Sequence, residues 1–237
     1  MRTEVILQHG WAFDSRAWWQ WLAPLHAAGA DVLLGERGYF GGTPFSPRFS
    51  SDAHLRVIVA HSLGLHMLDD DCLRDADVIL SIGGFLQFHP DQPLDRKRSQ
   101  RVMRMMLEKF RVAPYEVLQQ FLANSYYPTS ETMPVSYPHS HLDVDKLFDD
   151  LKFLDGTVLN PELLRGKQLI VVHGAHDKIV PVTAAAAMME ALPESAFYLF
   201  TEGGHALSLT HASECLHLLS NIFNRSRLSP AATMLEN

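Results

Sequence analysis

The sequence has few cysteines and no long apolar run, and each shortage excludes a class of protein. Only Cys72 and Cys215 occur in 237 residues. They lie far apart, so we expect buried free thiols in a reducing compartment rather than a disulfide framework. No stretch approaches the roughly 18 consecutive apolar residues of a membrane-spanning helix. The first residues also lack the apolar length and cleavage site of a signal peptide, so we expect a cytoplasmic protein without a membrane partner.

Basic charge is scarce as well. The formal net charge is −7, with 20 Lys and Arg against 27 Asp and Glu, which argues against general nucleic-acid binding. Histidine is frequent, with 13 residues. The closest pairs are His173 with His176 and His139 with His141, and neither has a cysteine or carboxylate at ligand spacing. We therefore predict no metal site and no cofactor, and we expect a monomer.

What the chain does contain is an alternation of strands and helices. Continuous apolar runs predict six strands, at 3–8, 30–34, 55–60, 77–82, 168–172 and 196–200. Helices are predicted at about 15–28, 181–192 and 211–223. Such a pattern is typical of a mostly parallel sheet with helices on both faces. Residues 85–164 interrupt it and are too long for a loop, so we predict a helical cap inserted between core segments 1–84 and 165–237.

The segment Ala60-His61-Ser62-Leu63-Gly64 has the pattern of a nucleophile elbow. It follows a predicted strand and precedes a short helix-like run, which is the context that this turn requires. The turn is so sharp that only small residues fit two positions either side of the serine. Ser62 is therefore the candidate nucleophile.

A serine nucleophile needs a base and a group that orients the base. In proteins with this elbow, the three follow the chain order serine, acid, histidine. Asp177 follows the fifth predicted strand, and His205 follows the sixth within Gly203-Gly204-His205. Because the carboxyl ends of parallel strands meet at one edge of a sheet, we predict a triad of Ser62, Asp177 and His205.

The attack by a serine creates an oxyanion, which two backbone N–H groups are expected to bind. One should be Leu63, directly after the nucleophile. The other should lie in the loop after the first strand, where the candidate is Trp11. The Trp11 side chain could also form a wall of the acyl pocket, so Trp11, Leu63 and His205 are predicted to contact substrate.

Other charged or titratable residues receive structural interpretations. His61 adjoins Ser62, but adjacent residues in such a turn point in different directions, so we expect it to line the pocket rather than act as the base. Two acidic groups are interpreted as solvated charge without chemistry; their members are Asp69, Asp70 and Asp71, and Asp143, Asp145, Asp149 and Asp150.

These motifs resemble the α/β-hydrolase superfamily, and within it the pimeloyl-[acyl-carrier-protein] methyl ester esterases of biotin synthesis. The resemblance rests on His9-Gly10-Trp11, Ser62-Leu63-Gly64, the run from Phe197 into Gly204-His205-Ala206, and the segment 211–219. It implies a sheet shortened at its N-terminal side, because the chain starts at the third strand of the full fold. It also implies hydrolysis of the methyl ester of pimeloyl-acyl-carrier protein, with Phe121 of the cap near the acyl chain.

In that family the cap grips the acidic carrier protein. Here the stretch from Asp95 to Arg111 holds seven basic and two acidic residues in an acidic chain. Lys97, Arg101 and Arg104 recur at helical spacing on one face, while Met103, Met106, Leu107 and Phe110 fall on another. A basic face of this kind would attract an acidic partner, although a merely solvated helix face has the same pattern.

Three alternatives stay open. A general short-chain carboxylesterase or thioesterase would use the same triad, because fold does not determine substrate. A hydrolase-like binding protein would use the triad residues only to hold a ligand. A lyase of the menaquinone type would use them without forming an acyl-enzyme.

Overall fold

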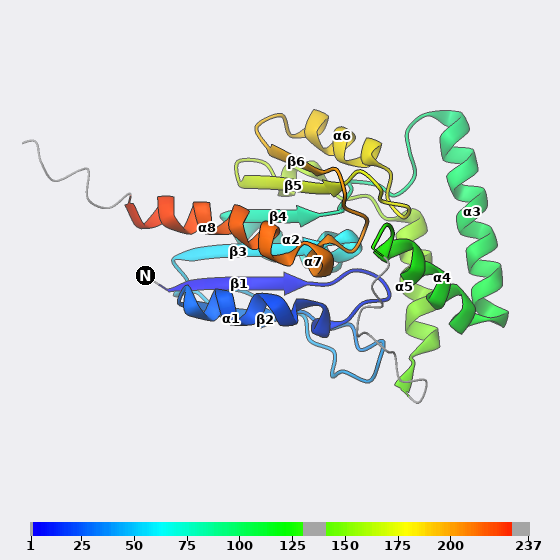
Figure 1. Ribbon diagram of the computed structural model, residues 1–237, viewed down its shortest axis with the longest axis horizontal. Coiled ribbons are helices and arrows are strands. Elements are labelled where there is room, and N and C mark those ends of the chain that lie inside the picture. The colour runs from blue at the N-terminus through cyan, green and yellow to red at the C-terminus, as the bar shows by residue number, and fades with distance from the viewer. Residues whose placement is uncertain (1, 130–140, 229–237) are drawn as a thin grey trace, which may run out of the picture.

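The computed structural model describes residues 2–129 and 141–228, with side chains as far as residue 220. Its centre is a parallel sheet in the strand order β2-β1-β3-β4-β5-β6 (Figure 1). The strands are β1 Thr3–Gln8, β2 Ala30–Leu34, β3 Leu55–His61, β4 Val78–Ile82, β5 Gln168–Gly174 and β6 Ala196–Phe200. The six predicted strands are confirmed, with ends that differ by two residues or fewer.

Helices cover both faces of this sheet because alternate residues of each strand point to opposite faces. On one face, Val5 and Leu7 of β1 pack with α1 (Trp19–Ala27) and α8 (Ala212–Leu228). On the other face, Ile6 packs with α2 (Asp70–Asp75) and α6 (Val182–Ala191). A 3₁₀ helix, Ser15–Trp18, precedes α1, and the short helix α7 (Leu207–Thr210) precedes α8.

The first helical region begins and ends as the sequence predicts. The Asp14 carboxylate accepts a hydrogen bond of 2.9 Å from the Arg16 amide, which caps the 3₁₀ helix. Gly29 follows α1 with a φ of 78°. This left-handed conformation is the usual one after a helix C-terminus, and glycine adopts it without steric cost.

The two edge strands differ from the prediction of a sheet covered on both faces. β6 is largely exposed, and its Phe197, Tyr198 and Leu199 side chains are 40%, 43% and 46% exposed. β2, at the opposite edge, is mostly half-buried. Apolar composition predicted that both segments are strands, but their exposure depends on the order of strands in the sheet. An edge strand has a neighbour on one side only.

The inserted segment lies between β4 and β5, beyond the carboxyl ends of the strands (Figure 1). It contains α3 (Pro93–Val112), α4 (Pro114–Tyr126) and α5 (Val144–Gly156). α3 is its outermost helix (Figure 1). The inserted helices pack with the loops after β1 and β2 in a third apolar cluster, which includes Trp11, Phe13, Tyr39, Phe110, Phe121 and Leu151.

The interpretation of Asp150 as solvated charge is wrong. Its side chain is buried, and it accepts hydrogen bonds of 2.9 and 2.6 Å from Arg37 and one of 2.5 Å from the Tyr39 hydroxyl. A buried carboxylate requires such partners because desolvation penalises an unpaired charge. Arg37 and Tyr39 belong to the loop after β2, so Asp150 fastens α5 to the core.

The two cysteines are free and buried, as predicted. Burial raises the pKa of Cys72 and of Cys215 to about 12, so both remain thiols at neutral pH. Across the described residues, no helix combines the length and apolarity needed to cross a bilayer.

Candidate active site

Ser62 occupies the turn between β3 and a 3₁₀ helix, Ser62–Met67. Its φ is 55°, a left-handed conformation that is costly for a residue with a side chain. The helix-like run predicted after the elbow belongs to this 3₁₀ helix, which ends at Met67 before α2 begins. The structure therefore has the strained strand-to-helix turn that the sequence pattern predicts.

Close backbone contacts explain the small residues around Ser62. A Cβ built on Gly64 would lie 2.6 Å from the main-chain oxygen of Gln8 and 3.3 Å from the Ala60 Cβ. Any side chain at position 64 would therefore collide with β1. The methyl group of Ala60 fits, but a larger side chain there would meet Gly64. Alanine is accordingly tolerated at the first position and glycine is required at the second.

Asp177 and His205 form a buried pair. The His205 Nδ1 lies 2.7 Å from the Asp177 Oδ2, and both side chains are at most 1% exposed. The Asp177 Oδ1 accepts hydrogen bonds of 2.8 Å from the amides of Ile179 and Val180. Burial alone would raise the pKa of Asp177, but the neighbouring His205, His173 and the Val180 amide lower it below its ordinary value. Asp177 is therefore a carboxylate that orients the imidazole.

The second nitrogen of His205 is available for catalysis. Because Nδ1 donates to Asp177, Nε2 carries the lone pair. Nε2 is buried and has no hydrogen-bond partner among the described residues, so Ser62 does not donate to it in this conformation. Catalytic hydrogen bonds are often long before substrate binds. The arrangement places the predicted base at the same sheet edge as Ser62, with its ring oriented by Asp177.

The loop after β1 lies against the elbow. A Cβ built on Gly10 would be 2.8 Å from the Ser62 Cβ and 3.3 Å from the Leu63 nitrogen. Glycine at this position thus allows the main chain that leads to Trp11 to approach the amide of Leu63. This approach is what the two predicted oxyanion donors require.

The side chains of Trp11 and Phe121 meet beside this loop. The rings are 4.8 Å apart in an edge-to-face arrangement, and the Phe121 ring is 6.4 Å from that of His205. The Trp11 Nε1 donates a hydrogen bond of 2.8 Å to the Leu147 carbonyl of α5. The structure thus brings the predicted cap aromatic next to the predicted base.

Several residues near the candidate triad were not assigned a role from the sequence. His173, on β5, donates from Nε2 to the Val180 carbonyl at 2.9 Å and so supports the loop that carries Asp177. Gly83 has a φ of 58°, and a Cβ there would lie 3.3 Å from the His205 Nδ1. The pair Gly83-Gly84 at the end of β4 is the sequence signal that could have indicated this close approach.

His61 is fully buried rather than a simple pocket-lining residue. Its Nε2 lies 3.0 Å from the main-chain oxygen of His205. Burial, together with the adjacent His205, lowers the pKa of His61 to about 3, so the ring is neutral at physiological pH.

Helix α4 also contacts the loop that carries the base. The Ala206 amide donates a hydrogen bond of 2.9 Å to the Ser125 carbonyl. Gly204 lies so close to the Tyr127 carbonyl that a Cβ would collide with it. The end of α4 is therefore seated directly on the segment around His205.

The predicted docking residues lie elsewhere, on the outer surface of α3. Lys97, Arg101 and Arg104 are exposed, and no ion pair involves them within the described part of the chain. Met103 and Phe110 of the same helix are buried. The predicted division of α3 into a basic and an apolar face is confirmed.

A second serine–histidine–aspartate row joins the linker before α3 to the inserted helices. The His89 Nδ1 lies 2.8 Å from the Ser99 Oγ, and its Nε2 lies 2.8 Å from an Asp155 oxygen. Ser99 lies within α3, where the neighbouring amides are committed to carbonyls one turn earlier. The amides beside Ser99 are therefore not free to bind an oxyanion, and this row links α3, α5 and the linker.

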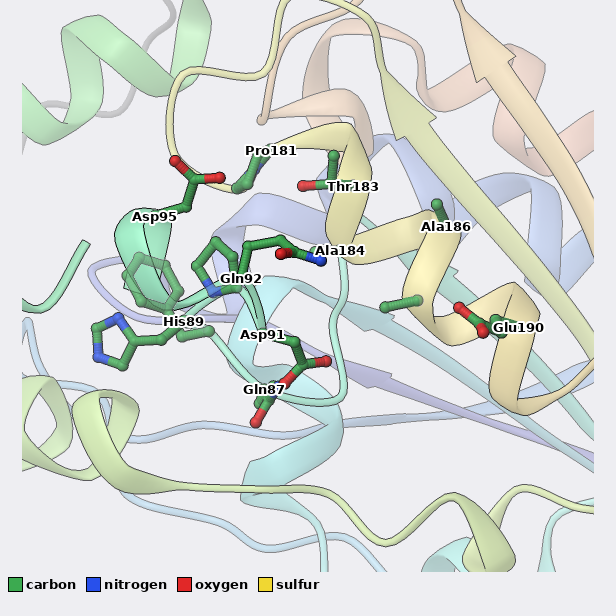
Figure 2. A pocket seen from close by; sticks show the side chains of 13 residues that line it. Gln87, His89, Asp91, Gln92, Asp95, Pro181, Thr183, Ala184, Ala186 and Glu190 are labelled. Atoms are coloured by element: carbon green, nitrogen blue, oxygen red, sulfur yellow. The ribbon is translucent and has the colours of Figure 1, made fainter. Parts of the chain in front are cut away.

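His89 also lines a cavity of about 490 Å³ between this linker and α6 (Figure 2). Asp91 lies in the linker, Asp95 in the first turn of α3 and Glu190 on α6. None of Ser62, Asp177 and His205 lines this cavity. In residues 2–129 and 141–228, no group of three or more His, Cys, Asp or Glu side chains could hold a metal ion. His139, of the histidine pair noted above, lies outside these residues.

No protein-family model and no curated protein matches the chain. Solved structures do match its fold. A bromoperoxidase from Bacillus anthracis has 18% identity and a TM-score of 0.71, with 95% of this chain and 92% of that one covered. The esterase EaEST from Exiguobacterium antarcticum has 15% identity and a TM-score of 0.75, with 94% and 92% covered. An enol-lactonase from Burkholderia xenovorans LB400 has 12% identity and a TM-score of 0.73, also with 94% and 92% covered. The chain has the α/β-hydrolase fold, with α3–α5 as the inserted helical segment.

Proposed function

We propose that this chain is a serine hydrolase that cleaves carboxylic esters, with Ser62 as nucleophile, His205 as base and Asp177 as orienting acid. The observation that carries the proposal is the His205 imidazole: Nδ1 is held by Asp177, and the buried Nε2 is unpartnered among the described residues. It lies at the sheet edge where Ser62 occupies a strained turn. The esterase among the structural neighbours supports this class, whereas the bromoperoxidase shows that the fold alone does not determine the reaction.

The chemistry follows from these positions. Ser62 Oγ attacks the ester carbonyl carbon while His205 Nε2 takes its proton. The amides of Leu63 and Trp11 bind the resulting oxyanion. Collapse of the intermediate expels the alcohol, which receives the proton from His205, and leaves the acyl group on Ser62. Water then attacks that ester with His205 again as base. The second intermediate collapses, His205 returns the proton to Ser62 Oγ, and the acid is released while Asp177 remains a carboxylate.

The direct test is Ser62→Ala in an assay of p-nitrophenyl acetate and butyrate hydrolysis. We expect kcat to fall by on the order of 10⁴-fold or more, since removal of a triad serine eliminates covalent catalysis. Ser81→Ala is the matched control, because Ser81 is a buried serine on β4 that pairs in register with Ala60. Unchanged activity in Ser62→Ala would remove the triad from the mechanism.

Mass spectrometry of the protein during turnover separates the hydrolase from its alternatives. An ester hydrolase should accumulate an acyl adduct on Ser62 with a slowly deacylating substrate. Turnover without any adduct would favour a lyase, and binding without turnover would favour a ligand-binding protein.

A narrower candidate substrate is an acyl chain carried by an acidic protein, as in the methyl ester of pimeloyl-acyl-carrier protein. Its support is the exposed basic face of α3, where Lys97, Arg101 and Arg104 are not committed to ion pairs within the described residues. The double variant Arg101→Glu with Arg104→Glu should lower kcat/KM for the carrier-linked ester by about tenfold or more. Its activity on small esters should change by less than about twofold. Equal losses on both substrates would contradict docking at this face, and Arg74→Glu on α2 is the control for a distant charge reversal.

A further inference from the structure

His61 connects the strand that ends at the candidate nucleophile to the loop that carries the candidate base. It is the last residue of β3, and its side chain is fully buried. Its Nε2 lies 3.0 Å from the main-chain oxygen of His205, 144 positions away in the sequence. A carbonyl oxygen can only accept, so the His61 Nε2 carries the proton and donates it.

We propose that His61 is a positioning residue, whose Nε2–H fixes the main chain of His205 relative to Ser62. This inference rests on the proposed function, because the position of His205 matters for catalysis only if His205 is the base. The side chain of His205 is oriented by Asp177 and the next residue by Ser125 of α4. The bond from His61 adds a direct link to the segment that contains the nucleophile.

Ring contacts hold His61 in the orientation that this bond requires. Its ring centroid is 4.8 Å from that of His205 and 5.0 Å from that of Phe13, which meets it edge to face. The ring is therefore packed between the loop after β1 and the loop after β6. Both loops contribute proposed catalytic groups.

The state of the other ring nitrogen indicates why a histidine occupies this position. His61 Nδ1 is buried and has no hydrogen-bond partner among the described residues. An unpaired buried acceptor costs free energy that an apolar side chain of similar size would avoid. Histidine offsets this cost because its Nε2–H donates a hydrogen bond to the His205 carbonyl. Because burial keeps the ring neutral at physiological pH, His61 acts as a fixed donor and not as a second base.

The test compares two substitutions at His61. In His61→Gln the amide nitrogen can occupy the place of Nε2, whereas His61→Leu removes the donor. We expect kcat for p-nitrophenyl butyrate to fall by about 10²-fold in His61→Leu, as for other small misplacements of catalytic groups. KM should change by less than about twofold, and His61→Gln should recover most of kcat. If His61→Leu does not fold, His61→Asn takes its place in the comparison. The asparagine side chain is one carbon shorter than that of glutamine, so its amide does not reach the His205 carbonyl.

His66 provides a matched control within the same turn. Its Nε2 lies 3.0 Å from the Phe85 carbonyl, and burial lowers its pKa to about 4, but it contacts neither Asp177 nor His205. His66→Leu and His66→Gln should therefore have the same kcat as each other. The proton NMR resonance of the His205–Asp177 hydrogen bond should shift in His61→Leu and stay in place in His66→Leu.

Two results would overturn the proposal. One is a His61→Leu protein whose kcat and NMR resonance match those of the unaltered chain. The other is an equal loss of kcat in His61→Leu and His61→Gln that tracks a loss of thermal stability, which would indicate packing alone. If the unaltered chain hydrolyses no ester, the proposed function fails. The NMR comparison still tests whether His61 positions His205.

Discussion

The sheet edge around Ser62 and the outer helix α3 are stabilised in opposite ways. At the edge, buried histidines donate to main-chain carbonyls outside their own strand, as His61 does to the distant His205 and His173 to Val180 in the loop after β5. α3 instead buries Met103 and Phe110 against α4 and α5 and turns its charges to solvent. The edge therefore depends on particular donors and acceptors, while α3 depends mostly on the burial of its apolar residues, to which the hydrogen bond between His89 and Ser99 adds a polar link.

The inserted segment is joined to the core by particular donors and acceptors, like those at the sheet edge. α5 joins the core through Asp150, which is paired with Arg37 and Tyr39, and through the Leu147 carbonyl, which accepts from Trp11. Trp11 is also the proposed second oxyanion donor. The placement of α5 is thus coupled to the loop that carries Trp11 by buried polar contacts, whereas α3 meets Trp11 through the apolar ring of Phe110, with centroids 6.0 Å apart.

The largest expected effect is the loss of stability in acid that the buried histidines at the sheet edge around Ser62 should cause. Burial lowers the pKa of His61 to about 3 and of His66 to about 4, and it also lowers the pKa of His9 and His173. Below pH 6.5 the unfolded chain binds protons at these positions and the folded protein does not. The free energy of unfolding should therefore fall from pH 7 to pH 5 by roughly 2 kcal/mol for each of His61 and His66.

Urea unfolding at a series of pH values measures this loss. In His66→Gln the unfolded chain binds about one proton fewer near pH 5. The free energy of unfolding should therefore fall less steeply between pH 7 and pH 5 than in the unaltered chain. A slope that is the same in His66→Gln and in the unaltered chain would show that His66 titrates equally in the folded and unfolded states.

The next effect tests the link between the edge and α5. Asp150→Ala leaves the Arg37 guanidinium and the Tyr39 hydroxyl without their partner. Removing one member of a buried pair is costly because the other charge stays desolvated, and Arg37 retains some solvent contact, so we expect a loss of about 3 kcal/mol. The adjacent Asp149 is exposed and pairs with Lys152, so Asp149→Ala should change stability by less than about 0.5 kcal/mol. If urea unfolding gives the same loss of unfolding free energy for both substitutions, the pairing of Asp150 with Arg37 and Tyr39 does not stabilise the fold.

These two neighbouring aspartates show where sequence-based prediction stops. Asp149 and Asp150 look alike in the sequence, and both were predicted to be solvated. What distinguishes them is Arg37 and Tyr39, more than a hundred positions away, which no local pattern indicates. The exposure of β6 could not be predicted either, because it depends on the order of strands in the sheet. The role of His61 is likewise not visible in the sequence, since the carbonyl that it contacts belongs to His205, 144 positions away.

The sequence predicted correctly those features that depend on residues close together in the chain. Apolar runs predicted the strands to within two residues at each end, and the carboxyl ends of parallel strands necessarily share an edge. The elbow around Ser62 follows from the small residues that a sharp turn requires. Asp177 and His205 follow β5 and β6 at this edge, and the His205 Nδ1 lies 2.7 Å from the Asp177 Oδ2.

The smallest effects are expected on α3, where two methionines two residues apart test the predicted division of the helix. Met103 is 3% exposed and Met105 is 58% exposed. Met103→Ala should lower the free energy of unfolding by about 2 kcal/mol, because it leaves a cavity between α3 and its neighbours. Met105→Ala removes a side chain that is largely in solvent and should change the free energy of unfolding by less than about 0.5 kcal/mol.

Because α3 does not contribute to the proposed triad, neither variant should alter kcat for a small ester by more than about twofold. A large loss of kcat in Met103→Ala without unfolding would show instead that α3 helps to position the catalytic loops, and the contrast between the two regions would fail.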